Sequence, residues 1–238
     1  SVTTGIYNTA VGYAALATEN ISGMNTAIGY GALRSQNTTA EFGYNVAIGK
    51  DAYKSNDVSA DAEGSSGHGS GNVAIGYQSM NANNEGDNNV AVGTLTLKNN
   101  TTGHSSVAIG YESLKYNTTG GMNVAMGYQA LGSNTTAAYN VGVGAYSLTS
   151  NTTGVYNTAV GTSSLRLNTT GYYNSAFGNS VLNANTTGYH NTGTGYGALV
   201  ANTEGIGNTA SGYEALQSNT TGDYNIAIGY EALAANTT

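Results

Sequence analysis

Two acidic side chains at the same position of neighbouring repeats are the strongest candidates for catalysis in this sequence. Glu214 and Glu231 belong to consecutive repeats, and each follows a Gly-Tyr pair. Retaining glycosidases use two carboxyl groups about 5 Å apart as nucleophile and acid. The same repeat position holds Glu112, Gln78 and Gln129, which is typical of a site that faces solvent. We therefore expect exposed charges at this position and no catalytic pair.

Histidine and cysteine offer no alternative chemistry. His68, His104 and His190 stand at different positions of the repeat, so stacking the repeats does not gather them into a metal site or a catalytic triad. The chain has no cysteine, which excludes disulfides and thiolate metal sites. We predict a protein that is not an enzyme and that holds no metal and no cofactor.

The asparagines of the recurring N-T-T turns match the N-x-S/T acceptor pattern for glycosylation. A row of glycans would suit a secreted fibre. Asparagine and threonine also satisfy the hydrogen bonds of turns and stack as amide and hydroxyl ladders, and we favour this second interpretation. The candidate residues are Asn100, Asn117, Asn134, Asn151, Asn168, Asn185, Asn219 and Asn236.

Tyrosines form a second regular row, because one follows the core glycine in many repeats. An exposed ladder of rings would suit stacking against sugars. Alternatively the rings cover the backbone or fill a seam between chains, where their area and mutual contact stabilise the fold, and we favour packing. The candidate ladder is Tyr111, Tyr128, Tyr196, Tyr213 and Tyr230.

These residues recur because the sequence consists of thirteen copies of one short unit, N-T/V-A-V/I-G-Y-x-A-L-x-x-N-T-T-G-x-Y. From Asn72 onward every step between units has the same length, whereas the steps from Asn25 to Asn45 and from Asn45 to Asn72 are longer. Helix-pair repeats need about 33 or more residues, so this period is too short for them. The units begin at Asn8, Asn25, Asn45, Asn72, Asn89, Ser106, Asn123, Asn140, Asn157, Asn174, Asn191, Asn208 and Asn225.

The composition excludes several classes of partner. The net charge is −7 with only six Lys and Arg, so no basic face is available to neutralise nucleic acid phosphates. No apolar stretch is long enough to span a membrane, and no basic amphipathic helix is present to coat one. We predict no nucleic acid partner and no membrane insertion.

Each unit is expected to fold as one coil of a parallel β-solenoid. The alternation in N-V-A-I-G is typical of a short strand, and N-T-T-G is typical of a turn. Glycine, asparagine and threonine are too frequent for helix. The predicted fold is an all-β roll of about thirteen 17-residue coils, and residues 1–238 form a single repeat array.

The side chains of one coil supply a thin core. Positions two and four, as in Val107 and Ile109, share one face of the strand with period 2, and leucine at position nine is the largest recurrent aliphatic group. The Ala and Gly of positions three and five form a second, nearly flat face. We expect several chains, most simply three, to pack against this flat face, because little apolar area otherwise offsets the entropy of ordering.

Units such as Ser106 to Ser113, S-V-A-I-G-Y-E-S, resemble the head repeats of trimeric autotransporter adhesins of the YadA type. The N-T-A-V-G-Y-x-A-L-x-x-N-T-T-G form also resembles repeats in tail fibres of marine bacteriophages. The likeness covers essentially the whole chain, although its period is longer than that of the adhesin coils. It implies a parallel β-roll in which three chains associate.

The longest insertion, residues 56–71, is expected to be a surface loop, because insertions in solenoids map to their surface. The chain begins and stops within a unit, and we expect it to be a segment of a longer fibre protein.

These features favour a structural or adhesive segment of an extracellular fibre, located at a cell surface or on a virion. Such a segment would give reach, rigidity and multivalent contact for host attachment, with other copies of itself and surface glycans as partners. One alternative is a self-assembling extracellular or surface-layer filament. A second is an ice-binding solenoid, in which Thr118, Thr135, Thr152 and Thr169 would form a flat hydroxyl ladder.

Overall fold

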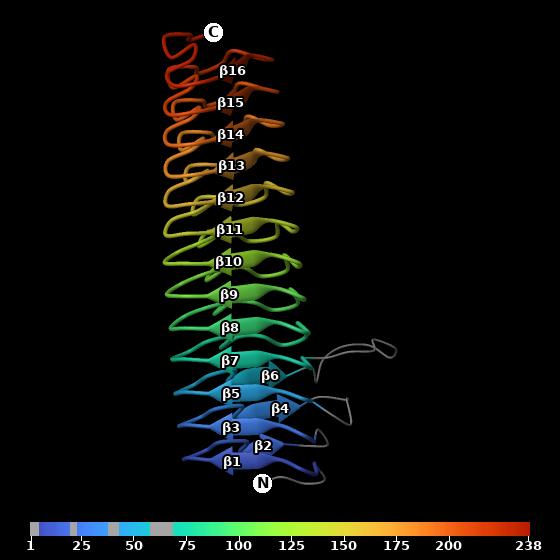
Figure 1. Ribbon diagram of the computed structural model, residues 1–238. Helices are drawn as coiled ribbons and strands as arrows, with labels where there is room; N and C mark the ends of the chain where they lie inside the picture. The colour runs from blue at the N-terminus through green and yellow to red at the C-terminus, as the bar shows by residue number, and fades with distance from the viewer. Residues whose placement is uncertain (1–4, 20–22, 38–42, 58–68) are drawn as a thin grey trace. The chain divides into compact units, whose positions relative to one another are not determined.

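The computed structural model describes residues 5–19, 23–37, 43–57 and 69–238. The chain divides into two compact units, Ser1–Met122 (unit 1) and Asn123–Thr238 (unit 2), and each is a stack of β-coils wound as a solenoid (Figure 1). The described residues form strands and turns but no helix, so they contain no helix able to cross a membrane. The all-β solenoid prediction is confirmed.

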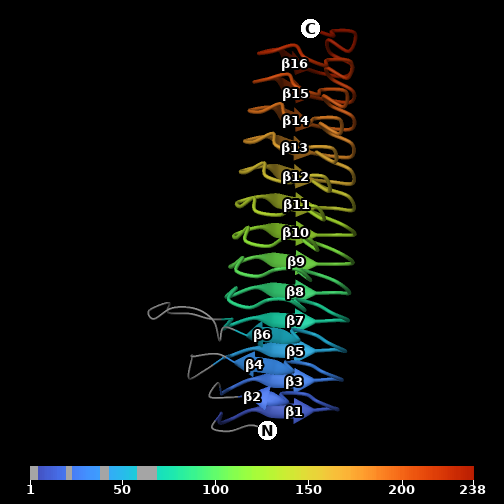
Figure 2. The same cartoon turned by 180° about the vertical axis from the view of Figure 1, so that it is seen from behind.

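Unit 1 contains two kinds of strand. The main sheet follows the order β1-β3-β5-β7-β8-β9, and a second sheet follows the order β2-β4-β6. Seen from behind, the strands of the second sheet alternate with those of the first (Figure 2). The bounds are β1 Thr9–Val11, β2 Thr18–Glu19, β3 Thr26–Ile28, β4 Ser35–Asn37, β5 Val46–Ile48, β6 Ser55–Asp57, β7 Val73–Ile75, β8 Val90–Val92 and β9 Val107–Ile109.

Unit 2 contains seven strands that pair in the order of the chain. All are parallel and in register, so each residue lies beside its equivalent in the next coil, as Thr158 lies beside Ser175. The bounds are β10 Val124–Met126, β11 Val141–Val143, β12 Thr158–Val160, β13 Ser175–Phe177, β14 Thr192–Thr194, β15 Thr209–Ser211 and β16 Ile226–Ile228.

The predicted loop at 56–71 lies mainly outside the described residues, because the structure describes nothing between Asp57 and Gly69. At its start the chain forms β6, and Gly69 to Gly71 complete the coil that began at Asn45.

The main-sheet strands point the alanine face inward and the Val/Ile face outward, which is the opposite of our expectation. The alanine at position three is fully buried in coil after coil, as at Ala108 and Ala159, whereas Val107 and Ile109 are partly exposed. The interior is narrow, so the small side chain faces inward and the larger β-branched ones face out. The flat Ala/Gly face is therefore not available to a neighbouring chain, and that argument for a trimer is wrong.

Leucine at position nine is the largest fully buried side chain of most coils. Leu114, Leu165 and Leu216 are fully buried, and Met80 and Tyr53 take the same place in their coils. Every one of these leucines adopts a left-handed backbone conformation, for example φ of 49° at Leu114 and 47° at Leu165. A bulky residue rarely adopts this conformation, which costs about 1–2 kcal/mol. Burying a leucine side chain contributes about 1.5–3 kcal/mol and offsets that cost.

The glycine at position five ends each strand. Gly144 has φ of 127°, and a Cβ built on it would lie 2.6 Å from both the carbonyl carbon and the oxygen of Gly161 in the next coil. Position seven has positive φ as well but tolerates side chains, since Gly197, Ser163 and Glu112 occupy it in different coils. Only position five requires glycine for both conformation and space.

We expect Gly144→Ala to lower the free energy of unfolding by about 3 kcal/mol, because the substitution combines a disfavoured conformation with a backbone clash. Urea unfolding followed by circular dichroism measures the effect. Gly197→Ser is the matched control, since other coils hold serine there at a similar φ, and it should cost about 1 kcal/mol or less. Equal losses for the two variants would show that steric contact at position five is unimportant.

Candidate functional surfaces

Two rows of buried asparagine connect each coil to the next. In the coil that begins at Asn174, the Nδ2 atoms of Asn174 and Asn185 both donate to the carbonyl oxygen of Gly188, at 2.8 and 2.9 Å. Asn185 Nδ2 also donates to Asn168 Oδ1 in the preceding coil at 2.8 Å, and Asn174 N donates to Asn157 Oδ1 at 3.0 Å. The amides thus close each coil across its interior and join it to its neighbour.

This network bears directly on the asparagines of the N-T-T turns. Seven of the eight candidates are fully buried, and the eighth, Asn236, is half-buried. A glycan attached to Nδ2 would have no room in the folded coil and would displace the hydrogen bonds of the amide. The geometry therefore favours the turn-ladder interpretation. The buried residues are Asn100, Asn117, Asn134, Asn151, Asn168, Asn185 and Asn219.

Tyr53 repairs this network in the coil that carries the long insertion. Its side chain lies in the leucine position, fully buried, and its hydroxyl donates to Gly69 O at 2.9 Å. That hydroxyl accepts hydrogen bonds from Asn83 Nδ2 at 2.9 Å and from Asn72 Nδ2 at 3.2 Å. Gly69 O and Asn83 Nδ2 correspond to partners that a position-twelve asparagine has in other coils, as Asn185 has Gly188 O and Asn202 Nδ2. Burial raises the pKa of Tyr53, so the phenol stays protonated as a donor.

The predicted tyrosine ladder lies on an exposed edge of the coils. In unit 2, Tyr213 stacks against Tyr196 at a centroid distance of 5.3 Å and against Tyr230 at 5.2 Å. Tyr128 instead meets Tyr146 edge-on at 5.2 Å. In unit 1, Tyr111 of the predicted ladder is exposed too, and the rings of Tyr13 and Tyr30 stack at 5.3 Å. The tyrosines are thus on the surface, and whether they lie in a seam between chains stays a prediction.

A lysine continues the ladder of unit 1 where no tyrosine is present. Lys50 takes the tyrosine position of its coil, and its Nζ lies 5.8 Å from the ring centre of Tyr30 and 5.9 Å from that of Tyr77. An ammonium group at this distance is attracted to the faces of both rings. The column therefore keeps attractive contacts across the substitution.

Stacking along the column limits how the tyrosines can bind a ligand. The rings of Tyr196, Tyr213 and Tyr230 are nearly parallel, with interplanar angles of 11° and 9°. Each inner ring therefore turns its faces toward its neighbours, and solvent reaches mainly the ring edges and hydroxyls. A sugar that stacks on an open ring face would find such a face only where a column ends.

The two candidate carboxylates belong to this same edge. Glu214 and Glu231 follow Tyr213 and Tyr230, and hydrogen bonds to these carboxylates raise the pKa of both tyrosines. Glu231 is exposed and Glu214 is partly exposed, as expected for a solvent-facing position. The carboxylates thus lie beside the tyrosine ladder on an edge that faces solvent.

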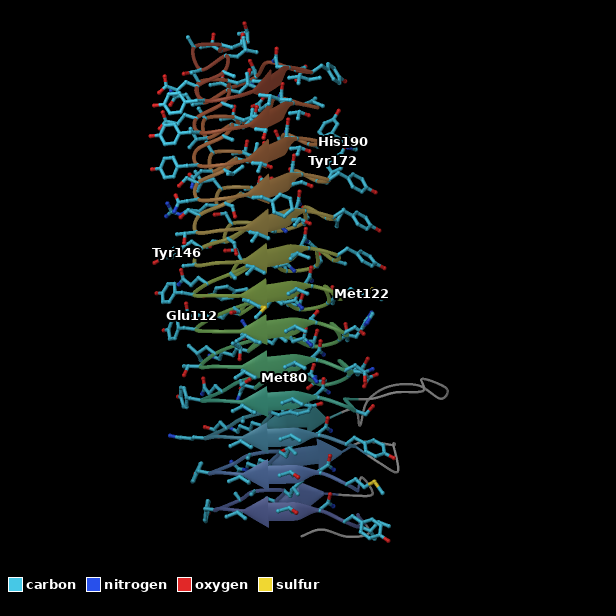
Figure 3. The ribbon with its side chains drawn as sticks, viewed as in Figure 1. Met80, Glu112, Met122, Tyr146, Tyr172 and His190 are labelled. Carbon is cyan, nitrogen blue, oxygen red and sulfur yellow. The ribbon has the colours of Figure 1, made fainter. Side chains whose placement is uncertain are left out.

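A second aromatic edge was not singled out from the sequence as a site. In unit 2 it lies across the coils from Tyr146 and includes Tyr172 and His190 (Figure 3). Tyr139, Tyr156 and Tyr173 stack there in one column. The sequence signal for this edge was the tyrosine that stands just before the core asparagine in several repeats. In unit 1, Glu112 and Met122 lie at opposite edges of the coil and Met80 lies inside.

Three threonines of the ladder proposed for ice binding use their hydroxyls in hydrogen bonds to the backbone. The hydroxyls of Thr135, Thr152 and Thr169 donate to threonine carbonyl oxygens of the following coils at 3.2, 3.1 and 3.1 Å. Thr118 accepts a similar bond through its carbonyl oxygen from Thr101. The exposed threonine row is the next position, which includes Thr153.

Among the described residues no group of three or more acidic, histidine or cysteine side chains lies close enough to bind a metal ion. His104 and His190 occupy exposed positions in different units, and His68 lies outside the described residues. Comparison of the chain with known protein families, with curated proteins and with solved structures found no match.

Substituting one buried amide should open the stack locally. Asn168→Ala removes the donor to Asn151 Oδ1 and Gly171 O and the acceptor for Asn185 Nδ2, so we expect the free energy of unfolding to fall by about 3 kcal/mol. Thr170→Ala, at an exposed position of the same turn, is the control and should change it by less than about 0.5 kcal/mol. A tolerated Asn168→Ala variant in thermal unfolding would contradict the structural role of the amide row.

Tyr53→Phe tests the hydroxyl that repairs the network. The ring remains, but Gly69 O and the two asparagine amides each lose one hydrogen-bond partner, and we expect a loss of about 2 kcal/mol. Tyr116→Phe, on an exposed tyrosine, should leave the unfolding midpoint unchanged. Urea denaturation monitored by circular dichroism compares the two, and similar midpoints would argue against the role assigned to Tyr53.

Proposed function

We propose that this chain is a non-enzymatic structural and adhesive segment of an extracellular fibre, as in a phage tail fibre or an adhesin-like stalk. The observation that carries the proposal is the use of the polar side chains. The recurrent asparagines and turn threonines bond coil to coil. Regular stacking of this kind supports a role in reach and rigidity, with many equivalent surface positions for weak multivalent contact.

The outward faces of the strands in unit 1 support association of several copies. In β5, β7, β8 and β9 both outward residues are Val or Ile, and no outward residue of these strands is charged. Contiguous apolar surface of this kind usually marks an interface. A second copy in the same register would present the same strip, and three copies about one axis would form a closed trimer. We place the trimer seam here, in place of the Ala/Gly face.

In unit 2, two strands carry polar outward residues. In unit 2, β14 carries Thr192 and Thr194, and β15 carries Thr209 and Ser211. Strands β10, β11 and β16 of unit 2 carry apolar outward residues, so we expect the seam to avoid β14 and β15 only. Surface glycans remain the candidate ligands, bound at tyrosine edges or at the ends of the columns.

The filament alternative keeps the same coils but places the contacts between the ends of successive chains. Long filaments in electron micrographs of the purified chain would favour it over a closed trimer. The ice-binding alternative gains no support from Thr135, Thr152 and Thr169, whose hydroxyls serve the backbone.

Charges placed on the seam should separate the chains. We expect the wild-type chain to sediment as a trimer and the Ile48→Lys, Ile75→Lys double variant to sediment as a monomer, because lysine on a desolvated apolar strip is unfavourable. Analytical ultracentrifugation measures the mass, and circular dichroism confirms that the variant keeps its β structure.

Thr194→Lys is the matched control, since it introduces the same charge at the same strand position in unit 2 and should leave the trimer intact. If the double variant unfolds, the milder Ile75→Thr should still weaken association measurably at low concentration. A wild-type chain that sediments as a 24.1 kDa monomer overturns the trimer.

A further inference from the structure

Six aromatic rings of unit 2 form one connected cluster on the edge that bears Tyr172 and His190 (Figure 3). The first column stacks Tyr139, Tyr156, Tyr173 and His190, with centroid distances of 4.9, 4.9 and 5.2 Å and interplanar angles of 5–7°. The second column stacks Tyr172 and Tyr189 at 4.6 Å and 7°. We call these six residues the two-column cluster.

Edge contacts join the two columns. The ring of Tyr172 lies 5.7 Å from that of Tyr173 and 5.8 Å from that of His190, and Tyr189 lies 5.4 Å from His190. Every ring in the cluster therefore has a close neighbour in its own or the adjacent column. A radical formed on one tyrosine can therefore be transferred to a neighbouring tyrosine ring.

The rings are also accessible. Tyr139, Tyr156 and Tyr173 are 46%, 45% and 48% exposed, so a dissolved oxidant reaches them. The sequence contains no cysteine and no tryptophan but has 19 tyrosines, and its four methionines are oxidised to the sulfoxide, which is not a one-electron oxidation. One-electron oxidation of this chain is therefore directed to tyrosine.

We propose that the two-column cluster is a site of oxidative tyrosine cross-linking, in which stacked rings of adjacent coils couple to dityrosine. The oxidant is a peroxide, used by a haem peroxidase. Each phenol loses one electron and one proton, and the two phenoxyl radicals form a carbon–carbon bond between their ortho positions. Loss of the two ring hydrogens as protons, with reprotonation of the oxygens, restores both phenols. For each bond, one hydrogen peroxide is reduced to two waters.

The coupled pairs are Tyr139 with Tyr156, Tyr156 with Tyr173, and Tyr172 with Tyr189. Each pair joins equivalent positions of consecutive coils with nearly parallel rings, so the stack holds the two reacting rings beside each other before reaction. A bond between them closes a loop of one coil and restrains the unfolded chain, as a disulfide does in other proteins. The chain has no cysteine, so it has no disulfide route to this restraint.

Treatment of the dilute, folded chain with hydrogen peroxide and a haem peroxidase tests the proposal. We expect dityrosine fluorescence, a chain mass lower by two hydrogen atoms per bond, and joined peptides that map to these three pairs within one chain. Cross-links found only between chains, or only at tyrosines outside the cluster, would overturn the proposal.

Tyr156→Phe combined with Tyr172→Phe removes all three pairs while keeping rings in the stacks, so folding should be preserved. We expect the dityrosine yield to fall about twofold or more, since coupling depends on rings held in contact. The control is Tyr116→Phe, because Tyr116 is exposed to a similar degree and faces Lys115 Nζ at 5.0 Å. An unchanged yield in the double variant, measured against this control, sinks the proposal.

Discussion

The coils depend on one carbonyl oxygen of the turn, which belongs to a glycine in most coils and to Ala137 in the coil from Asn123. In the coil from Asn157 it accepts two amide hydrogen bonds, from Asn157 at 2.8 Å and from Asn168 at 2.9 Å. This pair of bonds joins the strand to the turn across an interior too narrow for a large aliphatic core. Because a buried polar group without a partner costs about 1–3 kcal/mol, the two asparagines must recur together, and in the coil from Asn123 the carbonyl of Ala137 serves them equally well. The sequence repeats these residues because successive coils have the same hydrogen bonds to satisfy.

The backbone conformation of the coil follows from the same narrow interior. The chain turns sharply within each coil at residues with positive φ, as at Ser163, Leu165 and Tyr173. A single leucine in this conformation would be unusual in a globular protein. Here its burial outweighs the conformational cost by a small margin in each coil, and the backbone bond from Leu165 N to Val181 O at 2.9 Å adds to that margin.

Much of the fold could be predicted from periodicity, and the errors have one physical cause. The period, the short parallel strands and the turns were evident because Gly and Asn recur at fixed spacing. Period 2 defines two faces of a strand, but it does not say which one is inside. We placed Val107 and Ile109 inward because large aliphatics usually fill cores, whereas the lumen has room only for Ala108. The role of Tyr53 was hidden for a similar reason, since its partners are close only after the coils stack.

The register of identical coils has a consequence for how such a chain changes over generations. Each residue contacts its equivalent in the next coil, so gain or loss of one whole unit leaves nearly every local contact unaltered. The number of coils can then change by one with little effect on the contacts of the others. Residues that break the pattern, such as Tyr53 and Lys50, serve as landmarks, because a shift by one coil would separate them from the partners that only one alignment provides. The residues that depart from the repeat, rather than the repeated ones, therefore determine which coil packs against which.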